Sequence, residues 1–184
     1  SGLSAGSGVY PDCRNAHHPC RPGLCRTWYI EDGDITVKAG ETKGTNKVSQ
    51  GANQEVEDTD TIIKNREDTA SSNTVTIEAE KKDDKVEVTL KDVNIDTSSR
   101  KKAAVSVTGS GNTTIKLDGD NHLTGGNGSS GISSSGSLTI TGGETDSLTA
   151  KGGSGEDGGD GIFSKDLTIS GGTVTATGGV GHGQ

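Results

Sequence analysis

Hydrophobic and polar residues alternate over short stretches in the second half of the chain, and the alternation returns at a fixed interval. Residues 138–143 read LTITGG and 148–153 read LTAKGG, while 167–172 read LTISGG and 174–179 read VTATGG. A Gly-Ile pair precedes each set, at 131–132 and at 161–162, so the interval there is 30 residues. Repeats of this length are typical of solenoids. Because glycine and β-branched residues are poor helix formers, each unit predicts short strands.

Within each strand, the alternation separates an inner side from an outer side. We expect Leu138 and Ile140 to point into a core, with the threonines beside them facing water. Leu167 and Ile169 are expected to do the same one coil later. The paired glycines predict corners, because glycine tolerates positive φ and close backbone approach. Stacked in parallel, such coils bury a continuous core that no single coil can form.

The same pattern extends toward the N-terminus in a weaker form. It can be followed through residues 75–77, 86–90, 93–95, 104–107, 114–119 and 122–126. The sequence therefore predicts an all-β fold, a right-handed parallel β-helix (β-solenoid) of about four coils between residues 73 and 179. A β-sandwich also has short, evenly spaced strands, but it does not explain near-identical consecutive units.

Three segments divide the chain. Residues 1–26 form a Ser/Gly-rich start followed by a Cys/Pro/His-rich knot, residues 27–72 a cap strand with acidic loops, and residues 73–184 the coils. The polar stretch 41–72 is expected to be an irregular first turn with long loops. Hydrophobic residues make up only 26% of the 184 residues and aromatic residues 2%, which suits a thin solenoid core better than a large globular one.

Charge and hydropathy exclude several classes of partner. The net charge of −8 disfavours nucleic acid and anionic membranes, which bind to basic surfaces. No apolar run approaches the roughly 18 residues that a membrane-spanning helix needs, so membrane insertion is not expected. We expect an extracellular protein whose signal peptide has been removed.

Residues 11–25 differ in composition from the rest of the chain. They read PDCRNAHHPCRPGLC and contain all the prolines and all the cysteines, Cys13, Cys20 and Cys25. One disulfide would leave a thiol for pairing with another chain. Alternatively, three thiolates with His17 or His18 would hold a tetrahedral zinc, although the spacing matches no standard zinc finger. Free thiols are the third interpretation.

Trp28 and Tyr29 belong to the chain's only aromatic cluster, directly after this knot. They lie where the solenoid is expected to begin, which favours an N-terminal cap over the open end of the column. The alternative is a platform on which a sugar ring stacks.

Acidic residues in the coils allow two further sites. Residues 152–157 read GGSGED, the start of a calcium-binding nonapeptide, so Asp157 and Asp160 are candidate calcium ligands, with a simple corner loop as the alternative. Asp118 and Asp120 have the spacing of an acid and base pair, although Asp-Gly-Asp-Asn is more simply a turn. His122 is expected to be a surface residue.

The runs at 86–95, 103–105, 109–121 and 171–179 resemble the repeat region of surface proteins from anaerobic, gut-type bacteria. Those are described as carbohydrate-binding-domain proteins with right-handed parallel β-helices. The resemblance covers roughly residues 27–179 and implies an exported, non-catalytic protein that binds glycans, in some cases acidic sugars together with calcium. It assigns no binding residue, and the cysteine-rich segment departs from the family pattern.

Three functions follow as expectations. The first is an extracellular adhesin or carbohydrate-binding module of the bacterial cell surface. The second is a structural subunit that assembles head-to-tail with copies of itself into a filament, because an uncapped solenoid end offers unpaired strand edges and the number of cysteines is odd. The third, a polysaccharide lyase-like enzyme, is disfavoured because the coils after residue 103 carry mostly Ser, Thr and Gly.

Overall fold

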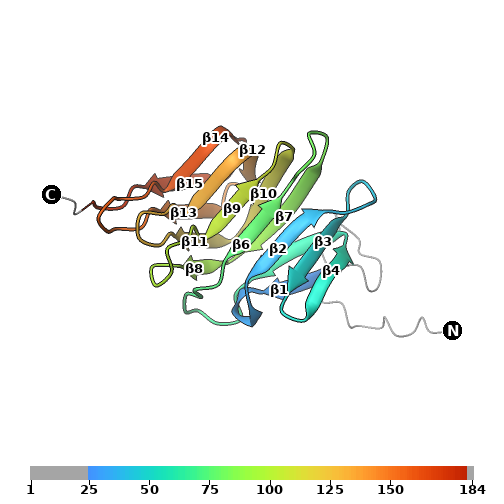
Figure 1. Ribbon diagram of the computed structural model, residues 1–184, viewed down its shortest axis with the longest axis horizontal. Coiled ribbons are helices and arrows are strands. Elements are labelled where there is room, and N and C mark those ends of the chain that lie inside the picture. Colours follow the sequence, from blue (N-terminus) through green and yellow to red (C-terminus); the bar gives the residue numbers. More distant parts are fainter. Residues whose placement is uncertain (1–24, 182–184) are drawn as a thin grey trace.

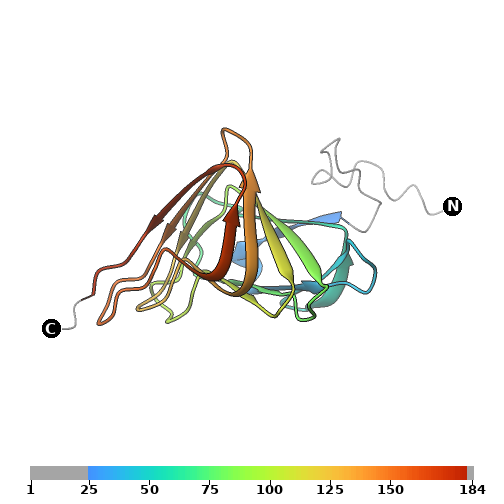
Figure 2. The same cartoon turned by 90° about the horizontal axis from the view of Figure 1, so that it is seen from above.

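The computed structural model describes residues 25–181, which form a parallel β-solenoid (Figures 1 and 2). Within that range the only helical element is a single 3-10 turn, η3 (Ile30–Asp32). All other elements are strands, and consecutive coils pair in parallel. The all-β parallel architecture predicted from the repeat is therefore confirmed.

The strands lie on three faces of the column. Face 1 contains β2 (Ile35–Ala39), β6 (Val75–Glu78), β9 (Val105–Thr108) and the first parts of β12 (Ile132–Gly142) and β14 (Ile162–Ile169). Face 2 contains β1 (Cys25–Tyr29), β5 (Asp60–Lys64), β7 (Lys85–Lys91), β10 (Asn112–Asp118) and the second parts of β12 and β14. Face 3 contains β8 (Asn94–Asp96), β11 (Asp120–Thr124), β13 (Ser147–Lys151) and β15 (Thr173–Thr177).

Two strands pass from face 1 to face 2 without a break. In β12 the register against β14 shifts between Ser134 and Ser137, and this irregularity turns the strand around the corner of the column. Earlier coils make the same corner with a loop between two separate strands, β9 and β10 or β6 and β7. Faces 1 and 2 consequently form one continuous sheet, while face 3 is a separate sheet of four strands.

The strand register shows how the repeats stack. On face 1, Val75 pairs with Val105, Val105 with Ile132, and Ile132 with Ile162. Like side chains therefore lie over like side chains, about 4.8 Å apart along the column. Four coils follow one another from β6 to β15, in agreement with the number predicted from the sequence.

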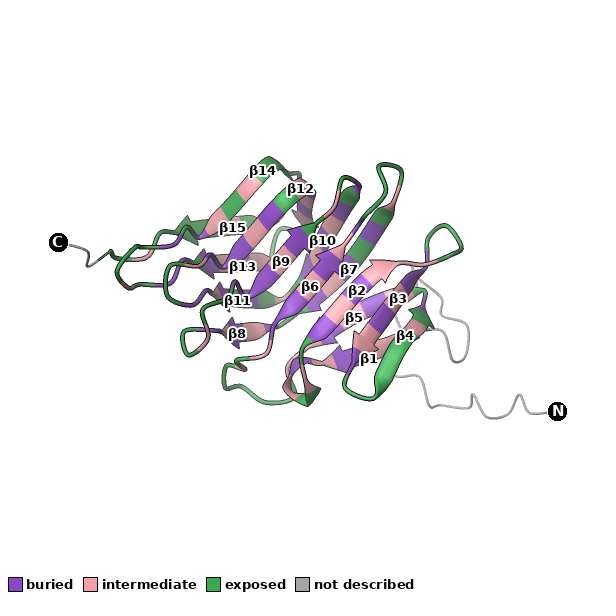
Figure 3. Cartoon of the chain, viewed as in Figure 1, coloured by how far each residue is buried: buried purple, intermediate pink, exposed green. Residues whose placement is uncertain are grey.

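The core is the sum of these inward ladders, seen as bands of buried residues across the strands in Figure 3. Leu138 and Ile140 are 1% and 0% exposed, as predicted. Leu167 and Ile169 occupy the equivalent positions one coil later but are 38% and 49% exposed, so the expectation that they are buried is wrong. Among the described residues, β14 has no further coil beyond it on face 2, so their apolar side chains stay uncovered.

The N-terminal end of the column is closed by a hairpin. After β2 the chain forms β3 (Asn46–Gln50) and β4 (Asn53–Asp58), which extend face 1 in antiparallel order. The side chain of Gln50 donates from Nε2 to the carbonyl oxygens of Tyr29 and Gly33 at 2.7 and 2.9 Å, so it satisfies backbone groups at this end. Residues 41–72 thus contain β3, β4 and β5, and are more regular than their polar composition predicts.

Trp28 lies beneath this hairpin. Its side chain is 2% exposed, and its indole Nε1 donates to Oδ2 of Asp58 at 2.7 Å. Asp58 is itself fully buried and also accepts from the backbone N–H of Asp60. Burial raises the pKa of the Asp58 carboxyl above its ordinary value, although the hydrogen bonds from Trp28 and Asp60 oppose the shift.

The Asp58 carboxyl should make stability depend on pH. Because the folded protein holds this proton more tightly than the unfolded chain does, Asp58 lowers the free energy of unfolding as the pH rises from its ordinary pKa of about 4 through its raised folded-state pKa. The Asp58→Asn variant has no such titration. Its stability relative to the wild type should therefore increase across that window, by about 1.4 kcal/mol per unit of pKa shift.

Urea unfolding of both proteins at a series of pH values measures this difference directly. Using the difference cancels the titration of all the other carboxyl groups. A difference that stays the same from about pH 3 to pH 7 would contradict the raised pKa.

Candidate functional site

A row of outward side chains runs along face 1, with one contribution from each coil. Thr76 pairs with Ser106, Ser106 with Ser133, and Ser133 with Phe163. Because neighbouring strands lie about 4.8 Å apart, the four side chains form a regular row. Three hydroxyl groups are followed by an aromatic ring that is 58% exposed.

The loops that precede the face-1 strands form a wall beside this row. They cover residues 97–104, 125–131 and 152–161, and they stack on one another through backbone hydrogen bonds. Gly126 donates to the carbonyl oxygen of Lys102 at 2.9 Å, and Gly153 donates to that of Ser129 at 2.8 Å. A Cβ atom at Gly159 would lie 2.0 Å from the carbonyl oxygen of Ser129, so only glycine allows this stacking.

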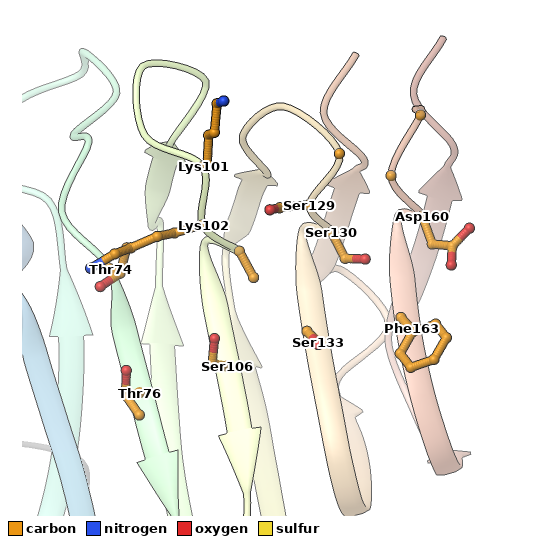
Figure 4. A pocket seen from close by; sticks show the side chains of 14 residues that line it. Thr74, Thr76, Lys101, Lys102, Ser106, Ser129, Ser130, Ser133, Asp160 and Phe163 are labelled. Atoms are coloured by element: carbon orange, nitrogen blue, oxygen red, sulfur yellow. The ribbon is translucent and has the colours of Figure 1, made fainter. Parts of the chain in front are cut away.

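The row and the loop wall together border a groove of about 650 Å³ (Figure 4). The loop side carries Lys101, Lys102, Ser129, Ser130 and Asp160. In Figure 4, the side chain of Lys102 extends along the groove toward Thr74, and the ring of Phe163 lies on the outer surface of β14. The groove therefore combines several hydroxyl groups, ammonium groups, one carboxylate and one exposed aromatic ring.

The segment Asp118-Gly119-Asp120 is a turn between faces 2 and 3. Gly119 has a φ of 77°, and its N–H donates to Oδ1 of Asp146 at 2.9 Å. The Asp120 carboxylate accepts from the Ser147 hydroxyl and lies 3.2 Å from Nε2 of His122. These two contacts, the one with Ser147 first, lower the pKa of Asp120, so this group is poorly suited to act as a general acid.

Trp28 and Tyr29 do not form a shared aromatic platform. They are consecutive residues of β1, so their side chains point to opposite sides of the strand. Trp28 is buried under the hairpin, whereas the ring of Tyr29 is covered by the guanidinium of Arg66, whose Cζ lies 4.1 Å from the ring centroid. The sugar-stacking interpretation is wrong for this pair, and Trp28 occupies the position of a cap residue.

The candidate calcium ligands Asp157 and Asp160 lie in the last stacked loop and are both exposed. Between residues 25 and 181, no group of three or more His, Cys, Asp or Glu residues is placed to hold a metal ion. A calcium ion here would need backbone carbonyl and water oxygens as its other ligands. Asp160 also lines the groove, whereas Asp157 does not.

The other predicted ligands fall outside the described residues. Cys13, Cys20, His17 and His18 lie in residues 1–24, and of Cys25 only the backbone is described, as the first residue of β1. The disulfide, the intermolecular thiol and the zinc site remain predictions from the sequence.

Sequence reasoning missed the groove. The outward positions of the face-1 strands are visible as polar residues in the alternation, but lining them up requires the register of four coils. The wall forms because loops of different sequence stack at the same corner of the column, and no sequence motif reveals this stacking. Phe163, the one phenylalanine of the chain, was the available signal, because it occupies an outward position next to an inward isoleucine.

Comparison of the chain with known protein families, curated proteins and solved structures finds no match. A search for membrane-crossing helices within residues 25–181 finds none that has the required length and apolar character.

Proposed function

We propose that this chain is a carbohydrate-binding β-solenoid of the bacterial cell exterior, and that the groove on face 1 holds the glycan. The observation that carries the proposal is the exposed ring of Phe163 at the end of a row of hydroxyl groups. Specific small-ligand sites combine an apolar surface with a few polar groups that fix orientation. A sugar ring has an apolar face for the aromatic ring and hydroxyl groups for hydrogen bonds, so its chemistry matches both parts.

The shape of the groove also supports a polymeric ligand. Its strand side repeats once per coil, so it offers similar contacts at successive positions along the column. Lys101 and Lys102 supply donors on the loop side, while Asp160 is the only carboxylate of the lining. Hydrolysis of a glycosidic bond commonly uses two carboxyl groups, so the lining supports binding without catalysis.

The Phe163→Ala variant should lose glycan binding without loss of stability. Truncating an aromatic side chain that anchors a ligand typically weakens the affinity by about tenfold or more. We would first identify a ligand on a glycan array and then measure its affinity by isothermal titration calorimetry, with and without calcium. Thr168→Ala is the matched control, since Thr168 is exposed on the same strand but faces outward from face 2.

Two outcomes would contradict the proposal that the glycan binds in the groove. One is an unchanged affinity in the Phe163→Ala variant, and the other is an equal loss in the Thr168→Ala control. If no glycan binds the wild-type protein at all, the carbohydrate-binding proposal itself fails. A thermal unfolding curve of each variant separates loss of binding from loss of fold.

A second candidate function rests on a different observation. Leu167 and Ile169 are 38% and 49% exposed at the last described coil, and within residues 25–181 the strands β14 and β15 have a neighbour on one side only. Exposed edges of this kind can pair with strands from another chain. Assembly of copies into an extracellular filament would cover these residues, and electron microscopy of the protein at micromolar concentration tests for it.

A further inference from the structure

Ser130 places a largely buried hydroxyl group in the wall of the face-1 groove. The residue is only 8% exposed, and it lines the groove from the loop that precedes β12. Within residues 25–181, this hydroxyl has no hydrogen-bond partner. Because a buried polar group without a partner is costly, most such groups in proteins are paired. A molecule bound in the groove would supply the partner that the protein itself does not.

The wall of the groove changes in step with the row of outward side chains on the strands. The wall positions equivalent to Ser130 are Ala103 in the coil before it and Asp160 in the coil after it. On the strand side, the same three coils carry in order Ser106, Ser133 and Phe163 (Figure 4). A chain of similar units that lies along the column therefore meets one wall position and one row position at each step of about 4.8 Å.

The geometry of the row restricts the shape of a glycan that can follow it. The outward positions of β6, β9, β12 and β14 keep one register, so the row is straight and evenly spaced. A glycan whose sugars are joined by equatorial 1,4 linkages is extended, and its length per sugar is close to the distance between neighbouring strands. A glycan with axial linkages at C1 curves, so it would leave the row within a short distance.

We propose that the groove binds an extended, equatorially 1,4-linked glycan of the cellulose, mannan or xylan type along the column, with one sugar over each of β6, β9, β12 and β14. The sugar over β14 stacks on Phe163, and the sugar over β12 lies between Ser133 and the hydroxyl of Ser130. The sugars over β9 and β6 extend the contact to Ser106 and Thr76. This inference rests on the carbohydrate-binding function proposed above and names the class of glycan.

Oligosaccharides of graded length test this arrangement by isothermal titration calorimetry with the full chain. The probes are the cello-, manno- and xylo-oligosaccharides from the disaccharide to the hexasaccharide, with malto-oligosaccharides as the curved control. We expect at least one of the extended series to gain affinity by about twofold to tenfold with each added sugar, the range of one net hydrogen bond. The gain should end at the tetrasaccharide, which spans the strands of the groove, and the malto-oligosaccharides should show no such gain.

The Thr76→Ala variant tests the direction in which the chain lies. Thr76 is at the opposite end of the row from Phe163, so its truncation should weaken binding of the tetrasaccharide by about twofold to tenfold and leave the disaccharide unaffected. Thr108→Ala is the matched control, because Thr108 is exposed on β9 of the same face but does not line the groove. This control should leave the affinity for every length unchanged.

The Ser130→Ala variant separates a role in binding from a role in the fold. The substitution removes a hydroxyl that has no partner among the described residues, so the thermal midpoint should stay the same or rise. The affinity for the disaccharide and for the tetrasaccharide should both fall by about twofold to tenfold, because the sugar over β12 is present in each. Unchanged affinities, or a loss that accompanies a lower thermal midpoint, would contradict the position given to Ser130.

Four further results would overturn this inference while carbohydrate binding stands. They are an affinity that does not depend on the length of the glycan, an equal gain for the malto-oligosaccharides, a weaker disaccharide affinity in the Thr76→Ala variant, and binding only to glycans outside the extended series. Each would show that a glycan binds in another arrangement. If the wild-type protein binds no glycan of any class, both this inference and the proposed function fail.

Discussion

The Gly152→Ala variant is expected to lose about 3 kcal/mol or more of its free energy of unfolding, enough to lower its thermal midpoint by several degrees. Gly152 lies at the corner after β13, where a Cβ atom would be 1.9 Å from the carbonyl oxygen of Gly159. That oxygen belongs to the backbone of the same loop, residues 152–161, where the N–H of Gly159 donates to the carbonyl oxygen of Gly153 at 2.8 Å, and it cannot rotate away as a side chain can. Relieving the contact requires the loop to change its backbone conformation.

Gly178→Ala is the control for this prediction, because Gly178 occupies the same corner one coil later. There the nearest heavy atom to a Cβ is the carbonyl oxygen of Gly159, at 3.6 Å, an ordinary contact. The substitution should therefore change the stability by less than about 1 kcal/mol. Denaturant unfolding of both variants measures the difference, and equal losses would show that the close backbone approach within this loop is not the cause.

The Trp28→Ala variant is expected to lose about 3–5 kcal/mol of its free energy of unfolding, the usual loss when a large buried aromatic residue is truncated. The change leaves a cavity beneath the β3–β4 hairpin. It also removes the indole N–H that donates to the buried carboxyl group of Asp58, and a buried polar group that loses a hydrogen-bond partner is costly. The loss should appear as a lower midpoint concentration in unfolding by guanidinium chloride.

Tyr29→Ala provides the comparison, since Tyr29 is the next residue of β1 but is only half-buried under Arg66. Its replacement should cost about 1 kcal/mol, the range of an exposed cation–π contact. If both substitutions cost the same, Trp28 does not act as the cap of the column.

The fold could be predicted well from the sequence because equivalent positions recur in consecutive coils. Each inward position recurs in four coils, so Leu138 or Ile140 was placed by several similar strands at once. The repeat pattern misled at the last described coil, where Leu167 and Ile169 have the sequence of core residues but no coil within residues 25–181 covers them. The alternation of apolar and polar residues predicts which side of the strand a side chain is on. Whether that side chain is buried depends on the neighbouring coil.

The candidate site was much harder to predict from the sequence than the fold. The polar residues of the groove are ordinary serines and threonines, and their alignment comes from register rather than from a motif. The antiparallel hairpin of β3 and β4 was also missed, because its strands are rich in charged and amide residues that read as loop. Its stability comes from tertiary contacts such as those of Gln50, and these join residues 17 and 21 positions apart.

The parallel stacking of like on like has a consequence for how such a protein can change in length. Each coil contacts only the coils beside it, so removing or duplicating one whole repeat leaves every remaining interface with a partner of the same shape. The row of hydroxyl groups on face 1 would shorten or lengthen by one member in the same step. If a glycan binds along this row, as we propose, the number of repeats sets the length of ligand that is contacted, and this number can vary without any redesign of the core.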